Sequence, residues 1–359
     1  MNKMKAIVKQ QMGAGLVMVD TNIPKIRDED VLIKVNKSAI CGTDLHIYKW
    51  DKWAESTIIP PLTIGHEFTG TIVEIGKNVT KSINIGDRVS AEGHLICGTC
   101  RNCRAGKFHL CPNTLGIGVN RNGAFAQFVA VPSFNVFKLP EYINDNIASI
   151  LDPIGNAVHT ALSFDLIGED ILINGAGPIG CIAAAICKKV GARNVVITDV
   201  NPYRLKLAQE MGADLGVNVS DCKNSNDITE KLKTIMHKIN MKEGFDVGLE
   251  MSGIESAINA MINVIIHGGK ISILGISSRD VSVDWNKIVF KSLNLKGIYG
   301  REVFETWYKM SSLIKSGLNL ERIITHIYDA SDFDKAFTLM ESGMSGKIIL
   351  DWTKINGKI

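Results

Sequence analysis

The chain has 359 residues, of which 45% are hydrophobic and 21% charged, and its net charge is +3. This composition is ordinary for a soluble globular protein, and the length predicts about two domains. The near balance of charges gives no sign of a nucleic-acid partner. We expect no membrane partner either, because the longest apolar run, Ile179 to Cys187, is far shorter than a membrane span.

The beginning of the chain, MNKMKAIVKQ, contains basic side chains but lacks the apolar core of a signal peptide. Without such a signal, the eight cysteines favour metal ligands or free thiols over disulfides. The expected location is therefore the cytoplasm.

Residues 1 to about 155 are expected to form short β-strands. Lys5 to Lys9, Val31 to Val35 and Phe68 to Ile75 are rich in β-branched side chains and are separated by polar or glycine turns. Weak alternation predicts a further strand over Gly123 to Val131. Many short strands at close spacing favour a partly open β-barrel over a parallel sheet.

A candidate catalytic metal site lies within this first part. Cys41, Thr43 and His46 stand close together, and His66 and Glu67 follow about one strand later. A thiolate, an imidazole and a carboxylate suit a catalytic zinc, which takes three protein ligands and leaves one position for substrate or water. If Cys41 and His46 stood alone, a buried thiol and a surface histidine would be the better interpretation. Thr43 alone would be a helix cap.

Four cysteines provide the strongest metal signal in the chain. Their spacing is Cys-x2-Cys-x2-Cys-x7-Cys, and they are Cys97, Cys100, Cys103 and Cys111. Four thiolates close a tetrahedral site with no open position, which is typical of a structural zinc. Nearby cations favour the thiolate form. An iron–sulfur cluster is the alternative, but the last gap is longer than the ferredoxin motif requires.

From about residue 156 the pattern changes to alternating strands and helices. The strand Ile171 to Asn174 runs into Gly175-Ala176-Gly177-Pro178-Ile179-Gly180, and an alanine-rich helix follows. A Gly-x-Gly-x-x-Gly between a strand and a helix predicts a dinucleotide site, because backbone amides can approach a pyrophosphate there. Asp199 ends the next strand and would bind the adenosine ribose, which favours NAD over NADP. Arg204 is interpreted as a ribose or adenine contact.

Further strands and helices complete a six-stranded, doubly wound sheet. The strands are expected at 216–219, 245–250, 270–274 and 294–298, and the helices at 201–211, 227–239 and 254–265. Another open α/β sheet without a nucleotide is the alternative. The last part should contain a helix over 301–315, a strand over 323–328, a helix that begins with a Ser331 cap, and a strand over 347–352. This tail is expected to pack on the first part.

Together these motifs resemble the zinc-dependent medium-chain dehydrogenase/reductase family over essentially the whole chain. The resemblance implies a GroES-like, partly open β-barrel catalytic domain formed by residues 1–155 and 298–359. It also implies a Rossmann NAD-binding domain formed by residues 156–297. The assembly in this family suggests a homotetramer.

The resemblance also implies two zinc ions per chain and a set of site residues. The catalytic zinc is expected on Cys41, His66 and Glu67, and the structural zinc on the four clustered cysteines. Thr43 and His46 would form a proton relay, and Asp152 would ligate or tune the catalytic metal. The expected cofactor contacts are Gly175, Gly177, Ile179, Gly180, Asp199, Arg204, Leu274, Gly275, Ile276, Ile298 and Tyr299.

Longer stretches resemble the members of the family that oxidise the hydroxyl of L-threonine. They are 39–53, 152–165 (DPIGNAVHTALSFD), 191–199 (GARNVVITD), 244–253 (GFDVGLEMSG) and 297–310 (GIYGREVFETWYKM). The implied reaction is NAD-dependent oxidation of L-threonine to 2-amino-3-oxobutanoate in threonine catabolism. A polyol or 2,3-butanediol dehydrogenase is the alternative. A family member without activity is a further alternative, but such relatives tend to lose the zinc ligands that are present here.

Overall fold

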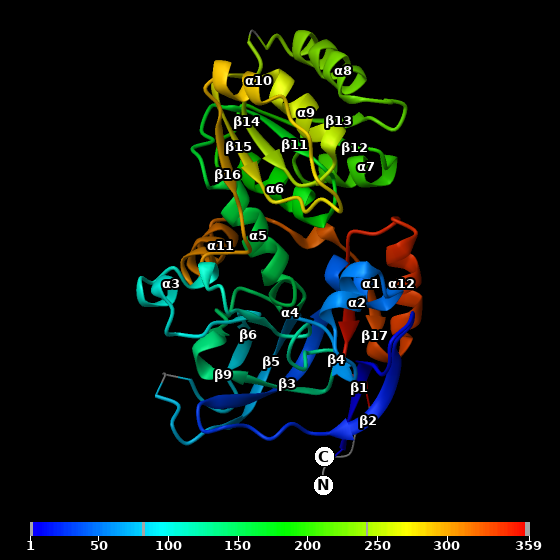
Figure 1. Cartoon of the computed structure of the whole chain (residues 1–359). Helices are drawn as coiled ribbons and strands as arrows, with labels where there is room; N and C mark the ends of the chain where they lie inside the picture. The colour runs from blue at the N-terminus through cyan, green and yellow to red at the C-terminus, as the bar shows by residue number, and fades with distance from the viewer. Residues whose placement is uncertain (1–2, 81–82, 242, 356–359) are drawn as a thin grey trace. The chain divides into compact units, whose positions relative to one another are not determined.

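The computed structural model describes residues 3–80, 83–241 and 243–355 (Figure 1). The chain divides into two compact units. The first contains Met1–Asp152, Glu302–Ser311 and Ile324–Ile359, and the second contains Pro153–Arg301 and Ser312–Ile323. In the described part of the chain, no helix combines the length and the apolarity that crossing a bilayer requires.

The first unit is built from short strands in three sheets. A three-stranded sheet has the order β2-β1-β4, with bounds β1 (Lys3–Lys9), β2 (Val17–Asn22) and β4 (Leu62–Thr63). The largest sheet contains β3 (Asp30–Ala39), β5 (Glu67–Ile75), β6 (Arg88–Ala91), β9 (Phe128–Pro132), β10 (Val136–Lys138), β17 (Ile324–Asp329) and β18 (Lys347–Asp351). A small sheet pairs β7 (His94–Leu95) with β8 (Leu115–Gly116). The expectation of many short strands in this part is confirmed.

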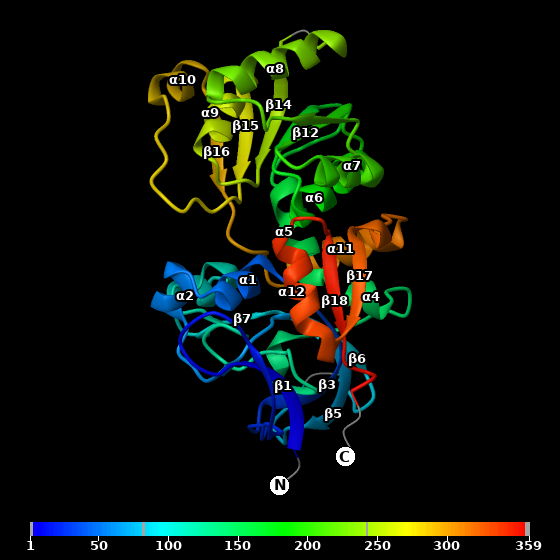
Figure 2. The ribbon, with the colours of Figure 1, turned by 90° about the vertical axis from the view of Figure 1, so that its right-hand side faces the viewer.

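Strand β3 is the centre of the largest sheet because it has three antiparallel partners. It pairs with β5, with β9 and, near its end, with β18 from the end of the chain. Val31, Ile33 and Val35 alternate along β3 and are at most 2% exposed. Figure 2 shows β18 in red beside β17 in orange, the pair by which the end of the chain joins this sheet.

Two short helices follow β3 and precede β5. Helix α1 (Gly42–Lys49) ends at Trp50, whose φ of 58° is left-handed, and α2 (Lys52–Thr57) begins directly after Asp51. The other helices and 3-10 turns of this unit are α3 (Arg101–Arg104), α4 (Asp145–Ala148), α12 (Phe333–Glu341), η1 (Phe108–Leu110), η2 (Ser133–Asn135) and η4 (Ala330–Asp332).

The second unit is a six-stranded parallel sheet with helices on both faces. The strand order is β13-β12-β11-β14-β15-β16, which is the 3-2-1-4-5-6 order of a dinucleotide-binding fold. The strands are β11 (Asp170–Asn174), β12 (Asn194–Asp199), β13 (Leu215–Asn218), β14 (Phe245–Glu250), β15 (Ile265–Ile273) and β16 (Asn294–Gly297). The predicted doubly wound sheet is confirmed.

The helices of this unit cover the sheet in two groups. Helices α8 and α9 pack over the face that carries Leu172, Val196 and Val217, whereas α6 and α7 contact each other (Figure 1). The bounds are α6 (Pro178–Lys189), α7 (Pro202–Met211), α8 (Ser225–Lys238), α9 (Glu255–Val264), α10 (Trp285–Phe290) and η3 (Glu321–Ile323). Because β11 and β12 are covered on both faces, the middle of each strand is apolar, as in residues 171–173 and 195–197, and polar residues stand at the strand ends.

Two helices are shared between the units. Helices α5 (Leu151–Ala161) and α11 (Glu305–Lys315) each contribute residues to both units. The buried indole of Trp307 donates to Glu92 Oε2 at 2.9 Å, which ties the start of α11 to the first unit. Lys189 Nζ donates to Ser316 O at 2.6 Å, which ties the residues after α11 to the second.

Two local expectations are wrong. Strand β9 begins only at Phe128, because the backbone N–H groups of Gly123 and Phe125 donate to the carbonyls of Thr63 and Ile64. Helix α12 begins at Phe333 and not after a Ser331 cap, and its preceding residue makes no side-chain cap bond.

One prediction concerns the core of the second unit. Ile171 on β11 is fully buried and Ile167 is 72% exposed. Ile171→Ala should lower the free energy of unfolding by about 2–5 kcal/mol through lost burial and a cavity. The matched change Ile167→Ala should cost less than about 0.5 kcal/mol. Urea unfolding followed by circular dichroism measures both, and equal shifts would contradict the assigned core.

Candidate metal and nucleotide sites

Two neighbouring strands bring Cys41, His66 and Glu67 together. Cys41 lies two residues after the end of β3, Glu67 is the first residue of β5, and His66 comes immediately before it. The register pairs Ala39 of β3 with Glu67 of β5. As a result, one donor atom from each of the three residues lies within 4.8 Å of the others. The residues that the sequence assigned to one site are therefore adjacent in space.

The surroundings of this cluster fit a bound cation. Glu67 is 1% exposed, and among the described residues neither its Oε1 nor Nδ1 of His66 has a hydrogen-bond partner. Burial raises the pKa of the Glu67 carboxyl, although the Lys347 ammonium opposes that shift. Buried polar atoms without partners are costly unless a ligand satisfies them. A sulfur, a nitrogen and an oxygen donor match the preferences of zinc.

Two charged residues around the cluster were missed from the sequence. Asp44 is fully buried, accepts the Cys41 N–H at 2.9 Å through Oδ2, and lies 3.8 Å from Nδ1 of His66 through Oδ1. Lys347 Nζ lies 2.5 Å from Glu67 Oε2 and donates to the carbonyl of Ile40 at 2.7 Å. No local pattern connects Lys347 to residues some 300 positions earlier.

The three proposed catalytic side chains have different places. The Thr43 hydroxyl lies 3.9 Å from the Cys41 sulfur, and the cap of α1 is Cys41 and not Thr43. His46 is three residues further along α1, on the same side, and its side chain is 59% exposed. Asp152 lies in the first turn of α5. Burial is the main cause of the raised pKa of Glu67, Lys347 opposes it, and the negative charge of Asp152 raises this pKa further.

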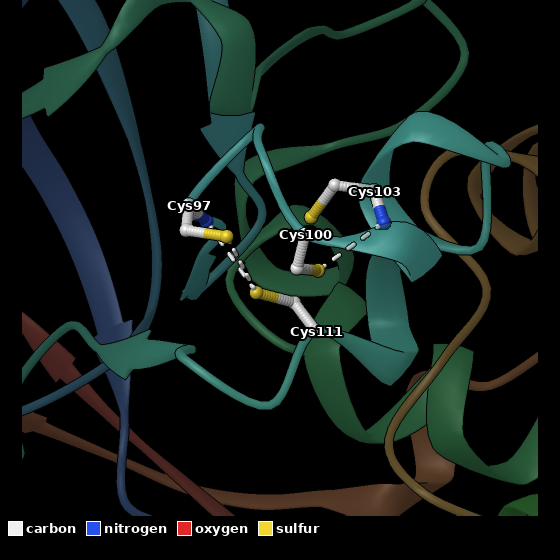
Figure 3. Close-up of side chains that lie close together, drawn as sticks. All are labelled: Cys97, Cys100, Cys103 and Cys111. Carbon is white, nitrogen blue, oxygen red and sulfur yellow. Dashed lines mark hydrogen bonds between the residues drawn. The ribbon is translucent and has the colours of Figure 1, made fainter.

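The four clustered cysteines form a second candidate metal site. Figure 3 shows their sulfur atoms directed toward a common centre, and all four lie within 4.8 Å of one another. The Cys97 and Cys111 sulfurs are 3.6 Å apart, too far for a disulfide. Backbone N–H groups of Thr99 and Cys100 lower the pKa of Cys97 to about 5. Burial raises the pKa of Cys103 to about 12, a shift that a divalent cation would reverse.

The glycine-rich turn of the second unit has the shape that a pyrophosphate requires. Gly175 has a φ of 93°, and a Cβ on Gly180 would lie 1.9 Å from the Gly175 carbonyl. At Gly177, the N-cap of α6, a Cβ would meet nothing within 4 Å, so the backbone there is open. Asp199 accepts the Ala176 N–H at 2.7 Å, which holds its carboxylate beside this turn. These features fit a dinucleotide.

The other expected cofactor contacts lie at or near the carboxyl ends of the strands. Ile179 lies in the first turn of α6, and Arg204 lies in the first turn of α7 with a buried Nε that has no partner among the described residues. Three more, Leu274, Gly275 and Ile276, follow β15 directly, and Ile298 and Tyr299 follow β16. Ligands of open α/β sheets bind at this edge.

Family models match most of the chain. Residues 27–141 match the alcohol dehydrogenase GroES-like domain, and residues 178–316 match the zinc-binding dehydrogenase model. A curated L-threonine 3-dehydrogenase of Shewanella loihica is 58% identical over 97% of this chain and 100% of that protein. One of Vibrio parahaemolyticus is 57% identical over 98% and 99%.

Solved structures have the same fold at lower identity. An Escherichia coli alcohol dehydrogenase in complex with NADH is 26% identical, with a TM-score of 0.87 over 98% of this chain and 100% of that one. A putative zinc-binding dehydrogenase of Sinorhizobium meliloti bound to NADP has the same identity, TM-score and coverage. The 2R,3R-butanediol dehydrogenase of Bacillus subtilis is 25% identical, with a TM-score of 0.84 over 97% and 99%.

The cysteine quartet yields a prediction about metal content. The wild-type protein should contain two zinc ions per chain, and Cys100→Ser should contain one, because a serine hydroxyl does not replace a thiolate ligand. Its unfolding midpoint should also fall. Cys222→Ser, outside both clusters, is the control and should keep both ions. Elemental analysis of dialysed protein counts them, and two ions in Cys100→Ser would contradict the assignment.

Asp199 yields a prediction about cofactor choice. Asp199→Asn removes the charge that repels a 2′-phosphate, so the ratio of the NADPH to the NADH dissociation constant should fall at least about tenfold. Fluorescence titration with each reduced cofactor measures the ratio. The exposed Asp221 provides the control change Asp221→Asn, which should leave the ratio unchanged. An unchanged ratio in Asp199→Asn would remove this carboxylate from cofactor selection.

Proposed function

Because the chain belongs to the zinc-dependent medium-chain dehydrogenase/reductase family, we propose that it oxidises the 3-hydroxyl of L-threonine to 2-amino-3-oxobutanoate with NAD. The observation that carries the proposal is the cluster of Cys41, His66 and Glu67, a donor set with unsatisfied polar atoms. The likeness to curated L-threonine 3-dehydrogenases over nearly the full length supports the choice of substrate.

In this proposal the two clusters hold zinc. Cys41, His66 and Glu67 hold the catalytic ion, which when bound supplies Lewis-acid polarisation of the substrate hydroxyl. The four clustered cysteines hold a structural ion. The carboxylate of Asp44 lies near His66 without a hydrogen bond to its ring and accepts the Cys41 N–H, and Lys347 balances the charge of the buried Glu67. Asp152 ligates the catalytic metal directly or tunes it through a water molecule.

The first unit also removes the hydroxyl proton. Thr43 stands next to Cys41 and can accept the proton and pass it on, since a hydroxyl both accepts and donates. His46 lies on the same side of α1 and is largely exposed, so it can carry the proton to solvent. The proton therefore leaves through side chains of the first unit, and the hydride is transferred to the cofactor.

The second unit supplies the hydride acceptor. Its glycine-rich turn binds the NAD pyrophosphate, and Asp199 binds the adenosine ribose and excludes a 2′-phosphate. NAD held by these residues would supply the hydride acceptor. We assign residues 1–155 and 298–359 to the catalytic domain and 156–297 to the NAD domain. The last of these residues, 356–359, lie outside the described chain.

Self-association is part of the proposal. Strand β16 is the edge of the six-stranded sheet, and all four of its residues are exposed. Phe290 and Trp285, just before it, are 78% and 68% exposed. An exposed strand edge beside exposed aromatic side chains supports a homotetramer, which light scattering can measure. The cytoplasmic location stays a prediction.

The second candidate is a polyol or 2,3-butanediol dehydrogenase, favoured by the shared fold with the Bacillus subtilis enzyme. With NAD, kcat/KM for L-threonine should exceed that for sorbitol and for 2,3-butanediol at least about a hundredfold, a difference of about 2.7 kcal/mol in transition-state binding. Initial rates of NADH formation measure all three. A higher kcat/KM for sorbitol or for 2,3-butanediol would show that L-threonine is not the preferred substrate.

The metal cluster yields a variant test. Cys41→Ser should lower kcat at least about a thousandfold, because several kcal/mol of Lewis-acid stabilisation are lost with the ion. NADH binding should stay unchanged, since the nucleotide residues lie in the other unit. Steady-state rates and fluorescence titration measure both. Turnover at the wild-type rate would remove Cys41 from the mechanism.

A further inference from the structure

The residue that connects α1 to α2 is held in place from several sides. The N–H groups of Trp50 and Asp51 both donate to the His46 carbonyl, at 2.9 and 3.4 Å. Asp51 then caps α2, where its Oδ1 accepts the N–H of Ala54 at 3.0 Å. The backbone of Asp51 and one of its two carboxylate oxygens therefore have fixed positions.

The other carboxylate oxygen is directed at the proposed proton carrier. Oδ2 of Asp51 lies 2.5 Å from Nδ1 of His46, and the Trp53 ring packs against the imidazole with centroids 6.0 Å apart and the ring planes at 64°. The side chains of His46 and Asp51 are 59% and 40% exposed. An exposed pair of this kind contributes little to stability. Its effect is on the orientation of the ring and on its tautomer.

The contact decides which ring nitrogen carries the proton in neutral His46. The backbone N–H of Ala54 lowers the pKa of Asp51, so its carboxylate is ionised near neutral pH and only accepts hydrogen bonds. Nδ1 of His46 must then be the donor. In a neutral imidazole the other nitrogen is the acceptor, which leaves Nε2 to take up a proton.

We propose that Asp51 is a positioning residue of the proton exit: it holds His46 as the Nδ1–H tautomer, so that Nε2 receives the proton passed on by Thr43. This inference rests on the proposed function. The hydride leaves the substrate carbon with both electrons of the C–H bond and reduces NAD. The hydroxyl proton moves through the Thr43 hydroxyl to His46 Nε2 and then to water. Asp51 accepts the Nδ1–H of the ring throughout and stays ionised.

Asparagine separates this role from helix capping. Only the oxygen of an Asn side chain can accept the Ala54 N–H, so Asp51→Asn keeps the cap and turns its amide NH2 toward His46. A donor opposite Nδ1 selects the opposite tautomer, with the proton on Nε2. In Ser-His-Asp triads the same replacement leaves the geometry intact but produces the wrong histidine tautomer. Asp51→Ser keeps a cap and removes the second contact.

The test compares wild type, Asp51→Asn, Asp51→Ser and Asp284→Asn with L-threonine and NAD. Asp284 caps α10 through the Lys287 N–H at 3.3 Å, so Asp284→Asn is a matched change at a cap in the other unit. In Asp51→Asn, kcat should fall at least about tenfold, with the KM of NAD and the zinc content unchanged. In Asp51→Ser the fall in kcat should be smaller, because the His46 ring then populates both tautomers. Asp284→Asn should keep the wild-type rate.

Nitrogen-15 labelling of the eight histidines supplies a readout that a merely structural role would not change. His46 should show a protonated Nδ1 in wild type and a protonated Nε2 in Asp51→Asn, and His46→Gln identifies its signals. An Nε2–H ring in wild type, or an unchanged kcat in Asp51→Asn, would overturn the inference. So would a loss of zinc or of NADH binding that accompanies the loss of kcat.

The proposed function fails in a different way. If wild type oxidises a diol and not L-threonine, the same variants are compared with that diol, and the tautomer readout is unaffected. If His46→Gln keeps the wild-type kcat while Cys41→Ser does not, the zinc dehydrogenase stands and the positioning role of Asp51 is rejected.

Discussion

The register between β3 and β5 is the constraint on which the candidate catalytic site depends. It places Ala39 opposite Glu67, and so brings Cys41, two residues after the end of β3, close to His66 and Glu67. A slip by one position would turn Glu67 to the opposite face. Gly70 helps to hold the register, since a Cβ there would lie 2.2 Å from the Lys34 carbonyl. The candidate metal ligands are therefore brought together by backbone pairing.

The negative charge of Glu67 is balanced by Lys347, which lies near the other end of the chain. Glu67 is removed from water, and its neighbour Lys347 belongs to β18, which joins the same sheet through β3. Removal of one partner from a buried pair typically costs about 3–5 kcal/mol, because the other charge is left without compensation. The last strand thus completes both the sheet and the electrostatics of the site. Asp44, which bonds the Cys41 N–H, couples the start of α1 to the same cluster.

The parts of the candidate sites that are close together in the sequence could be predicted, and the parts that depend on contacts between distant residues could not. The cysteine quartet and the glycine-rich turn were found from the sequence because their members are close neighbours in the chain. The six-stranded sheet was also predicted, since its buried strands are apolar and alternate with helices. The expected start of a strand at Gly123 is wrong because the N–H of Gly123 donates to the carbonyl of Thr63, a partner that no local pattern shows. Ser331 matched a capping pattern, but α12 begins two residues later.

By itself, the sequence determined the types of donor, the two metal-ligand spacings and the dinucleotide turn, because these depend on side-chain chemistry and on short stretches of backbone. Only the tertiary structure decided that Lys347 faces Glu67, that Trp307 donates to Glu92, and that the Asp51 carboxylate meets Nδ1 of His46. The first two contacts join residues more than 200 positions apart. The third depends on the left-handed turn at Trp50, which directs the chain back toward α1. Such contacts follow from how elements pack, and periodicity within one element carries no information about them.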